Sequence, residues 1–383
     1  MPSDVVVPVP GCRSTITITI TRIRMSRPTY VKTKIAQALP TGQKKSQLLG
    51  ALVSKEKTTL KYKGMKRYGN LFQQICSIEN LEMADAKARK GKCFQYGVQL
   101  HNKNRKANII RLREMLLNKT YTTSKYSVFR IYDPKERDVY RLPYYPDRIV
   151  HHAIMNLMEK IFVSTFTADT YSCIKGKGIH AAKRAVEKAL RNVPNTQYCL
   201  QIDIKKFYPS VNHDILKQLL RRKIKDPDLL WLLDDIIDSA DGLPIGNYLS
   251  QFFANFFLTY FDHWIKETIA VCSYFRYSDD IVILASNKPY LHRLLAAIRE
   301  YLKTNLKLDV KDNYQVFPID AQGIDFIGYK FYHGYTLLRK TIKQNFARAV
   351  AGSDNSLSIA SYWGWAKHCN SNHLIKKLFH ERV

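Results

Sequence analysis

Acidic residues are scarce in this sequence relative to basic ones. Its 383 residues include 32 Asp plus Glu against 61 Lys plus Arg, which gives a formal charge of +29. No run of eighteen apolar residues occurs, so no membrane-spanning helix is expected. Seven cysteines without CxxC spacing argue against a zinc ribbon or a disulfide framework and for reduced thiols. The start, MPSDVVVPVPGCRS, lacks the features of a signal peptide, so we expect a cytoplasmic protein.

Positive charge is concentrated at one end of the chain. Residues 1–120 contain 24 basic and 6 acidic side chains, whereas residues 201–300 contain 12 and 13. Aromatic residues lie among the basic ones, as in the segment from Tyr62 to Tyr68. Cations that neutralise phosphates release counterions, so such a surface binds polyanions without sequence preference. The pattern favours a nucleic-acid-binding protein over one whose basic tail only confers solubility.

Apolar residues make up 45% of the chain, enough for a packed core and two or three subdomains. Helical spacing predicts an amphipathic helix from Tyr68 to Leu81. Further helices are predicted at 104–118, after Pro146, at 179–191, 212–223, 228–239, 247–267 and 290–304, and over most of the last fifty residues. Strands are predicted as a hairpin within 126–143, at 197–204, on both sides of 278–280, at 307–317 and at 324–332.

Three acidic residues lie next to strongly apolar segments. Asp203 ends the predicted strand in QIDIKKFYPS, and Asp279 and Asp280 lie between two predicted strands in FRYSDDIVIL. An SDD turn alone is an ordinary feature, because aspartate is common in turns. If these strands are neighbours in one sheet, the three carboxylates form an oxygen-rich site for two Mg²⁺ ions. Such a site supports in-line displacement at phosphorus.

The two acidic segments resemble the palm of reverse transcriptases. YSDD at 277–280 matches the YxDD turn of that family, and DIKKFY at 203–208 matches its first metal-binding segment. Over residues 65–383, seven segments occur in the family's order: YRLPYYPDRIVHHAI, TADTYSCIKGKG, DIKKFYPS, GLPIGNYLSQ, YSDD, LKLDVKDN and GIDFIGYKF. The resemblance implies an α+β right-hand polymerase fold with fingers, palm and thumb. Its palm is expected to be an antiparallel sheet with helices packed on one face.

Composition and spacing before residue 65, and the resemblance after it, give an expected domain organisation. Residues 1–64 are expected to be a basic, disordered extension, and 65–120 a basic N-terminal helical segment. Fingers at 121–196, with 212–245 on the same side, precede a palm at 197–335 and a short helical thumb at 336–383.

Site residues follow from the same matched segments. The expected catalytic residues are Asp203, Asp279, Asp280 and Lys311, the last as a general acid toward pyrophosphate. The expected ligands of two Mg²⁺ ions, with Mn²⁺ as a substitute, are Asp203, Asp279, Asp280 and the backbone carbonyl of Ile204. The expected nucleotide-binding residues are Arg141, Lys175, Lys177, Tyr208, Ile245, Gly246 and Gln251, with Tyr208 excluding a ribose 2′-hydroxyl. The expected primer and template contacts are Tyr277, Gly328 and Tyr329.

One segment indicates a subgroup. GLPIGNYLSQ has Ile245 where many reverse transcriptases have Gln, and Gln251 where they have Pro. This IGxxxSQ pattern and the C-terminal SYWGWAKHCNS resemble the enzymes of diversity-generating retroelements. That resemblance implies a bacterial or phage-encoded enzyme that copies template adenines with errors. Its implied partners are template RNA, an RNA–cDNA duplex, dNTPs and a small basic ring-forming accessory protein, and no membrane.

Other interpretations remain open. A group II intron maturase has a longer chain after the palm, and a retron enzyme has a different thumb and the SP form of the GLPIG segment. A catalytically silent RNA-binding scaffold with a polymerase fold is a third possibility. The intact Asp203, Asp279 and Asp280 argue against the last one.

Overall fold

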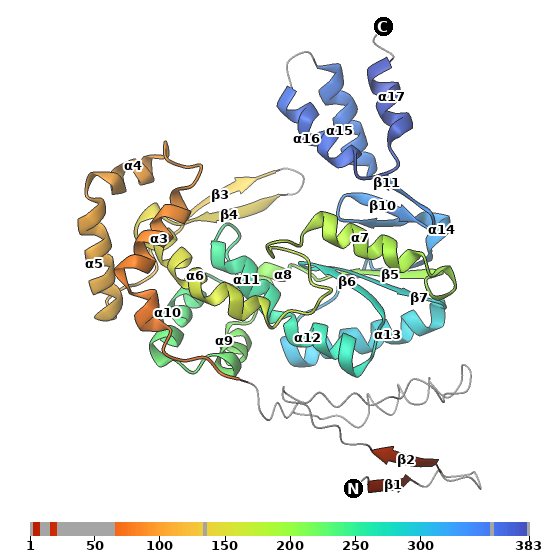
Figure 1. The fold of residues 1–383 in the computed structure, drawn as a ribbon, viewed down its shortest axis with the longest axis horizontal. Helices are drawn as coiled ribbons and strands as arrows, with labels where there is room; N and C mark the ends of the chain where they lie inside the picture. The colour runs from red at the N-terminus through yellow and green to blue at the C-terminus, as the bar shows by residue number, and fades with distance from the viewer. Residues whose placement is uncertain (1–2, 8–15, 21–65, 133–135, 353–355, 381–383) are drawn as a thin grey trace. The chain divides into compact units, whose positions relative to one another are not determined.

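The computed structural model describes residues 3–7, 16–20, 66–132, 136–352 and 356–380 (Figure 1). The chain divides into two units, residues 1–61 and 62–383. In the first unit, β1 (Ser3–Val7) pairs antiparallel with β2 (Ile16–Ile20). Both strands lie within the segment 1–64, and the Thr/Ile alternation of β2 suits a pleated strand. The rest of 1–64 lies outside the described residues.

A four-stranded antiparallel sheet forms the centre of the second unit. Its strand order is β6-β7-β5-β8, from β5 (Tyr198–Asp203), β6 (Ser273–Tyr277), β7 (Asp280–Ala285) and β8 (Gln315–Pro318). The central strand β7 is buried from Ile281 to Ala285. A continuous apolar run of this kind occurs where both faces of a sheet are covered.

Both faces of this sheet are indeed covered. On one face, Leu200, Ile202 and Ile283 pack into a core with α11 (Tyr248–Phe257), α12 (Thr259–His263) and α13 (Lys288–Tyr301). On the other, Cys199 and Val282 share a core with α7 (Ile179–Leu190). Figure 1 shows α13 and α7 on opposite sides of the strands. The α+β class is thus as predicted, and α7 adds a second covering layer to the one expected.

The polypeptide before this sheet is mainly helical. α6 (Ile149–Val163) packs against α3 (Ile78–Arg89) and carries nine buried residues. β3 (Ser127–Ile131) and β4 (Arg137–Arg141) form the predicted hairpin. This part also contains α2 (Phe72–Ile75), α4 (Tyr96–Lys103) and α5 (Arg105–Leu117). Between β5 and β6, the chain adds α8 (Phe207–Ser210), α9 (His213–Lys223) and α10 (Pro227–Asp238).

Two sequence-based predictions about these helices need correction. The helix expected from Tyr68 to Leu81 is broken, because the Ser77 side chain accepts a hydrogen bond from the Asn80 amide and begins α3 there. The helix expected over 247–267 is α11 followed by α12, with a π-helical turn at Trp264–Thr268. α4 was not predicted at all.

The C-terminal part has a small sheet and three helices. β9 (Ile324–Phe326), β10 (Tyr329–Tyr332) and β11 (Tyr335–Leu338) form an antiparallel sheet, followed by α15 (Lys340–Ala351), α16 (Ser356–Ala366) and α17 (Asn372–His380). The single strand expected at 324–332 reverses at Ile327 and Gly328, which both have positive φ. The strand expected at 307–317 is regular only from Gln315. Among the described residues, no helix is long and apolar enough to cross a membrane.

Candidate active site

The pairing of β5 with β7 brings the predicted acidic residues together. In the register of this pair, Asp203 lies directly opposite Asp280. The chain reverses between β6 and β7 through Ser278 and Asp279, with Tyr277 paired to Asp280. Ser278 has a φ of 59°, as a two-residue hairpin turn of the primed type requires. Asp203 and Asp280 are 77 positions apart in sequence, yet they lie together at one end of the sheet, where β5 ends and β7 begins.

Burial and mutual repulsion raise the pKa values of the carboxyl groups at this end of the sheet. Burial, and then repulsion from Asp203, raises the pKa of Asp279. Burial and repulsion from Asp203 and Asp279 raise the pKa of Asp280 to about 7, with partial relief from Arg339. Neighbouring carboxylates repel one another when they are all ionised. A cation bound between them would therefore be stabilised.

Lys311 contacts the first of these acids through both its backbone and its side chain. Its amide donates to the Asp203 carbonyl at 2.9 Å, and its ammonium forms an ion pair with Asp203 Oδ2. The Lys205 amide donates to the Asp309 carbonyl, so Ile204 and Val310 form a bridge pair without mutual hydrogen bonds. The Ile204 carbonyl therefore points away from the 309–311 segment. The structure thus brings Lys311 to the predicted site.

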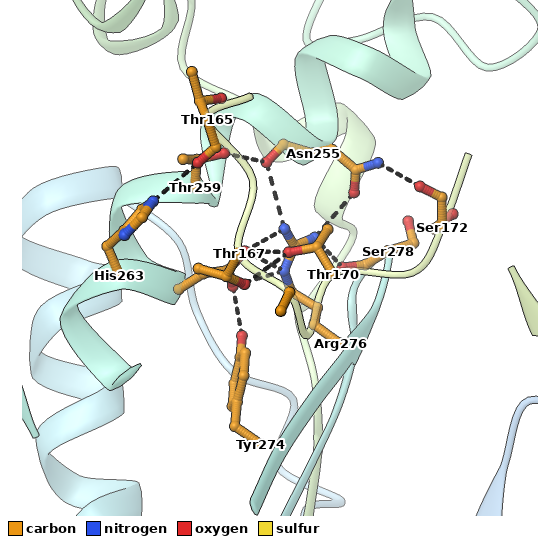
Figure 2. Close-up of polar contacts among 12 residues, drawn as sticks. Thr165, Thr167, Thr170, Ser172, Asn255, Thr259, His263, Tyr274, Arg276 and Ser278 are labelled. Carbon is orange, nitrogen blue, oxygen red and sulfur yellow. Dashed lines mark hydrogen bonds and ion pairs between the residues drawn. The ribbon is translucent and has the colours of Figure 1, made fainter. Parts of the chain in front are cut away.

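The fully buried Arg276 forms hydrogen bonds that hold the turn between β6 and β7 in place (Figure 2). Arg276 and Asp262 are both 0% exposed, and the guanidinium donates to both carboxylate oxygens of Asp262 at 2.5 to 3.0 Å. Arg276 also donates to the Ser278 carbonyl at 3.0 Å and to Asn255 Oδ1 at 3.1 Å. It holds the turn that carries Asp279 against α11 and α12.

The same network reaches the segment before α7. Thr170 donates to Asp262 at 3.0 Å, and Asn255 donates to the Ser172 carbonyl at 2.8 Å. Tyr274 donates to the other oxygen of Asp262 at 2.6 Å. Sequence reasoning missed Arg276 and Asp262. The available signal was a charged residue inside the otherwise apolar strand SYFRY, because a buried charge needs a partner.

Tyr208 lies beside the catalytic turn. Burial raises the pKa of its hydroxyl, and the nearby Ser278 partly offsets this. The Tyr208 carbonyl accepts from the Leu243 amide at 2.8 Å. Gly242 is needed at this contact, because its φ is +60° and a Cβ would lie 2.5 Å from the Tyr208 carbonyl oxygen. The ring is thus held beside the turn that carries Asp279.

The segment after Leu243 docks on the β3–β4 hairpin. The Tyr140 amide donates to the Ile245 carbonyl at 2.7 Å. Gly246 has a φ of +114°, and a Cβ there would lie 2.5 Å from the Tyr140 carbonyl oxygen. Gly246, Gln251 and Arg141 line one cavity of about 560 Å³. Three predicted nucleotide-binding residues are therefore brought together, while Ile245 lies half-buried next to them.

The two predicted lysines differ in their surroundings. Lys175 is exposed. Lys177 donates instead to the backbone carbonyls of Thr167, Ala168 and Thr170, at 3.0 to 3.2 Å. Because the Lys177 ammonium already donates to three carbonyls of the preceding segment, these contacts compete with the predicted contact to phosphate.

The predicted primer and template contacts require a correction. Tyr329 is 0% exposed and donates to the Trp365 carbonyl at 3.2 Å, so it belongs to the core and cannot face a nucleic acid. Gly328 has a φ of +85°, and a Cβ there would lie 2.6 Å from the Trp365 ring. Its role in the structure is close packing of the hairpin on α16. Tyr277 is half-buried beside the turn.

The chemistry of the site fits a divalent cation. Asp203 Oδ1 is buried and has no hydrogen-bond partner. The donors around it are carboxylate oxygens, which Mg²⁺ prefers. Among the described residues, however, no group of three or more His, Cys, Asp or Glu side chains is already placed to hold a metal ion. Lys311 supplies a cation to Asp203 in the arrangement seen.

Comparison with known proteins identifies the family. The family model for reverse transcriptase (RNA-dependent DNA polymerase) matches residues 134–331, just over half of the chain. The chain belongs to the reverse transcriptase family. The matched region contains Asp203, Asp279 and Asp280, and also strand β4 of the β3–β4 hairpin.

Individual relatives of this reverse transcriptase are distant. Protein YkfC of Escherichia coli K12 is 25% identical over 281 residues, covering 60% of this chain and 74% of that protein. Nuclear intron maturase 4, mitochondrial, of Arabidopsis thaliana is 26% identical over 142 residues, covering 34% of this chain and 17% of that protein. Apo telomerase from Candida tropicalis is 12% identical with a TM-score of 0.45, over 62% of this chain and 51% of that one. The chain spans about half of that telomerase and under a fifth of the maturase.

Proposed function

We propose that Asp203, Asp279 and Asp280 form the metal-binding centre of an active RNA-directed DNA polymerase. The observation that carries this proposal is the register that sets Asp203 opposite Asp280, with Asp279 in the adjoining turn. Asp203 and Asp279, supported by Asp280 and the Ile204 carbonyl, would hold two Mg²⁺ ions. When bound, the two ions would lower the pKa of the primer 3′-hydroxyl and neutralise negative charge on the triphosphate.

Two further residues have proposed roles at this centre. Tyr208, whose backbone is held by the 242–243 segment, presents a ring that excludes a ribose 2′-hydroxyl and so selects deoxynucleotides. Lys311, within reach of Asp203, donates a proton to the pyrophosphate leaving group. Arg141 and Gln251 contribute to the nucleotide surface through the cavity that they share with Gly246.

Primer extension tests this proposal. The purified chain should extend a DNA primer on an RNA template with dNTPs and Mg²⁺, and chelation of Mg²⁺ should stop it. Asp279→Ala should abolish extension, because it removes a ligand from the centre, while primer–template binding persists through the basic surface. A matched control is Asp320→Ala, an exposed acid that pairs with His333. Extension by Asp279→Ala at the control's rate would reject the catalytic assignment.

We further propose that copying is error-prone at template adenines, as in diversity-generating retroelements. Ile245 is held beside the hairpin by its carbonyl contact with Tyr140, and its aliphatic side chain cannot hydrogen-bond to an incoming nucleotide. A missing polar contact of this kind weakens discrimination by about 1–3 kcal/mol. The resulting cDNA would serve mutagenic retrohoming of a target gene.

Substitution of Ile245 tests the error-prone assignment. Ile245→Gln should lower misincorporation opposite adenine by about tenfold, because the amide restores a polar contact. Ile245→Leu, which keeps an aliphatic side chain, is the matched control. Sequencing of the cDNA gives the error spectrum for each variant. If both variants leave the spectrum of the parent enzyme unchanged, fidelity is set elsewhere.

Residues 65–120 are a proposed docking surface for template RNA or for a small basic ring-forming accessory protein. Deleting them would not be a clean test, because Leu81 and Ala84 of α3 lie in the main core. Met83 and Ile110 are exposed on α3 and α5 and suit a point-variant test. Loss of binding to the purified accessory protein in Met83→Asp and Ile110→Asp would support protein docking here, and full retention would contradict it.

An ordinary-fidelity enzyme of the retron or intron type is the second candidate. It is favoured by several distant relatives that are named as an intron maturase or as intron proteins. The adenine error spectrum distinguishes the two functions.

A further inference from the structure

The asparagine that precedes α11 is bonded to a distant segment and not to its own helix. Asparagine at this position usually accepts a hydrogen bond from an amide of the first helical turn. In the described part of the chain, Asn247 makes no such cap, although it is only 6% exposed. Its amide group donates to the Tyr126 hydroxyl at 2.7 Å, across 121 positions of sequence. This buried contact fixes the start of α11 relative to the segment before β3.

The Tyr126 hydroxyl continues this chain of hydrogen bonds to the end of α10. It lies 2.8 Å from Ser239 Oγ, and Ser239 donates to the Ile236 carbonyl at 2.7 Å. Because the single hydroxyl proton of Ser239 is donated to that carbonyl, Ser239 accepts from Tyr126. Tyr126 therefore accepts from Asn247 and donates to Ser239. These three side chains are termed here the Tyr126 chain, and hydrogen bonds aligned in this way strengthen one another.

The backbone that carries Tyr126 is itself held in place. The Thr123 amide and hydroxyl donate to Asp235 of α10, at 2.9 and 2.7 Å. The Ser124 amide donates to Asp147, which is 0% exposed, at 3.0 Å. The Tyr126 hydroxyl is thus a fixed attachment point for the start of α11.

Tyr126 also contacts the β3–β4 hairpin. Its ring packs edge-on against that of Tyr140, with ring centroids 5.6 Å apart and an interplanar angle of 85°. The Tyr140 amide donates to the Ile245 carbonyl at 2.7 Å, and Gly246 lies against the Tyr140 carbonyl. Ile245 and Gly246 are therefore held by Tyr140 on one side. Asn247, the next residue, holds them on the other side, and Tyr126 contacts both Tyr140 and Asn247.

We propose that Tyr126 is a positioning residue that sets nucleotide selection by fixing the Ile245–Gly246 segment against β4. The inference rests on the proposed function, in which Ile245 lies beside the incoming nucleotide. Residues that line a site discriminate well only when supporting hydrogen bonds hold them in place. The Tyr126 hydroxyl gives that support and acts through the segment, without touching the nucleotide. Its loss should raise errors opposite every template base, whereas the proposed effect of Ile245 is specific to adenine.

Hydrogen exchange tests the Tyr126 chain without reference to activity. The Tyr140 amide is protected by its bond to the Ile245 carbonyl, so its exchange rate reports on that contact. Tyr126→Phe keeps the ring and removes the hydroxyl. In the full chain it should speed exchange of the Tyr140 amide about fivefold, as expected for the loss of one neutral hydrogen bond. Tyr132→Phe makes the same change at a 73% exposed residue just after β3 and should leave the rate unchanged.

Single-nucleotide primer extension measures the effect on selection. Tyr126→Phe should raise the KM for the correct dNTP about fivefold with little change in kcat, and should raise misincorporation opposite all four template bases. Asn247→Leu removes the other partner of the same bond and should shift the KM and the error rate in the same direction. The double variant should be no worse than Tyr126→Phe alone, because that change already breaks the bond. A loss of stability alone would leave the error rate of the folded enzyme unchanged.

The outcomes separate this inference from the proposed function. Unchanged exchange of the Tyr140 amide in Tyr126→Phe would overturn the inference. Faster exchange with a dNTP KM and an error rate equal to those of the parent would also overturn it, because the bond would then have only a structural role. If the parent chain does not extend primers with Mg²⁺, the proposed function fails, and exchange of the Tyr140 amide alone decides whether Tyr126 holds the segment.

Discussion

At the scale of single residues, burial determines which titratable groups change their behaviour. His151 is 2% exposed in α6, and its Nε2 atom has no hydrogen-bond partner. Burial, together with His152 and Arg148, lowers its pKa to about 3. In an unfolded chain the pKa of histidine is about 6.5. The unfolded state therefore binds a proton below that pH while the folded state does not.

This difference predicts a pH dependence of stability. Above pH 6.5 the neutral His151 does not reduce the free energy of unfolding. As the pH decreases from 6.5 toward 3, protonation of His151 in the unfolded state lowers the free energy of unfolding. His151→Leu should remove that loss, by about 1.4 kcal/mol per pH unit below 6.5. Urea unfolding of parent and variant at pH 7 and pH 5 measures it. Taking the difference cancels groups of opposite sign such as Asp280, whose raised pKa favours the folded state at lower pH. Parallel pH profiles would contradict the prediction.

At the scale of elements, the Arg276–Asp262 pair joins β6, α12, α11 and the 167–172 segment. Both partners are fully buried, so removing one leaves an uncompensated charge in the core. The exposed pair Arg339–Asp325 provides a comparison of the same residue types in solvent. Surface pairs of this kind contribute under about 1 kcal/mol.

Substitution of the two arginines should therefore differ strongly. Arg276→Met should lower the free energy of unfolding by about 3–5 kcal/mol, and Arg276→Met/Asp262→Leu by less, because the double variant leaves no charge unpaired. Arg339→Met should cost less than about 1 kcal/mol. Chemical denaturation of the parent and of each variant under the same conditions gives the three changes in the free energy of unfolding. Equal costs for Arg276→Met and Arg339→Met would show that the buried network does not hold the turn.

Much at this scale could be predicted from the sequence. The 3.6-residue spacing and strand-length apolar runs predicted α5, α6, α7, α9, α10 and the β5, β6 and β7 strands. The break at Ser77 was missed, because apolar residues on both sides of it keep helical spacing while a side-chain cap ends the continuity.

At the scale of the whole molecule, the site depends on contacts that spacing alone does not reveal. The sequence marked Asp203, Asp279, Asp280 and Lys311, since acids and a lysine beside apolar strands carry a readable pattern. It did not reveal that Tyr329 is core or that Lys177 is engaged by three carbonyls. Those outcomes depend on which segments pack together.

The central claim is that the acids brought together by the β5–β7 register form one divalent-cation site. Titration of the full chain with Mn²⁺, followed by electron paramagnetic resonance of the free ion, tests it without reference to activity. We expect Asp203→Asn and Asp279→Asn each to weaken Mn²⁺ binding at least about tenfold, and Asp320→Asn, an exposed acid paired with His333, to leave it unchanged. Parent-like Mn²⁺ affinity in Asp203→Asn and Asp279→Asn would contradict the account.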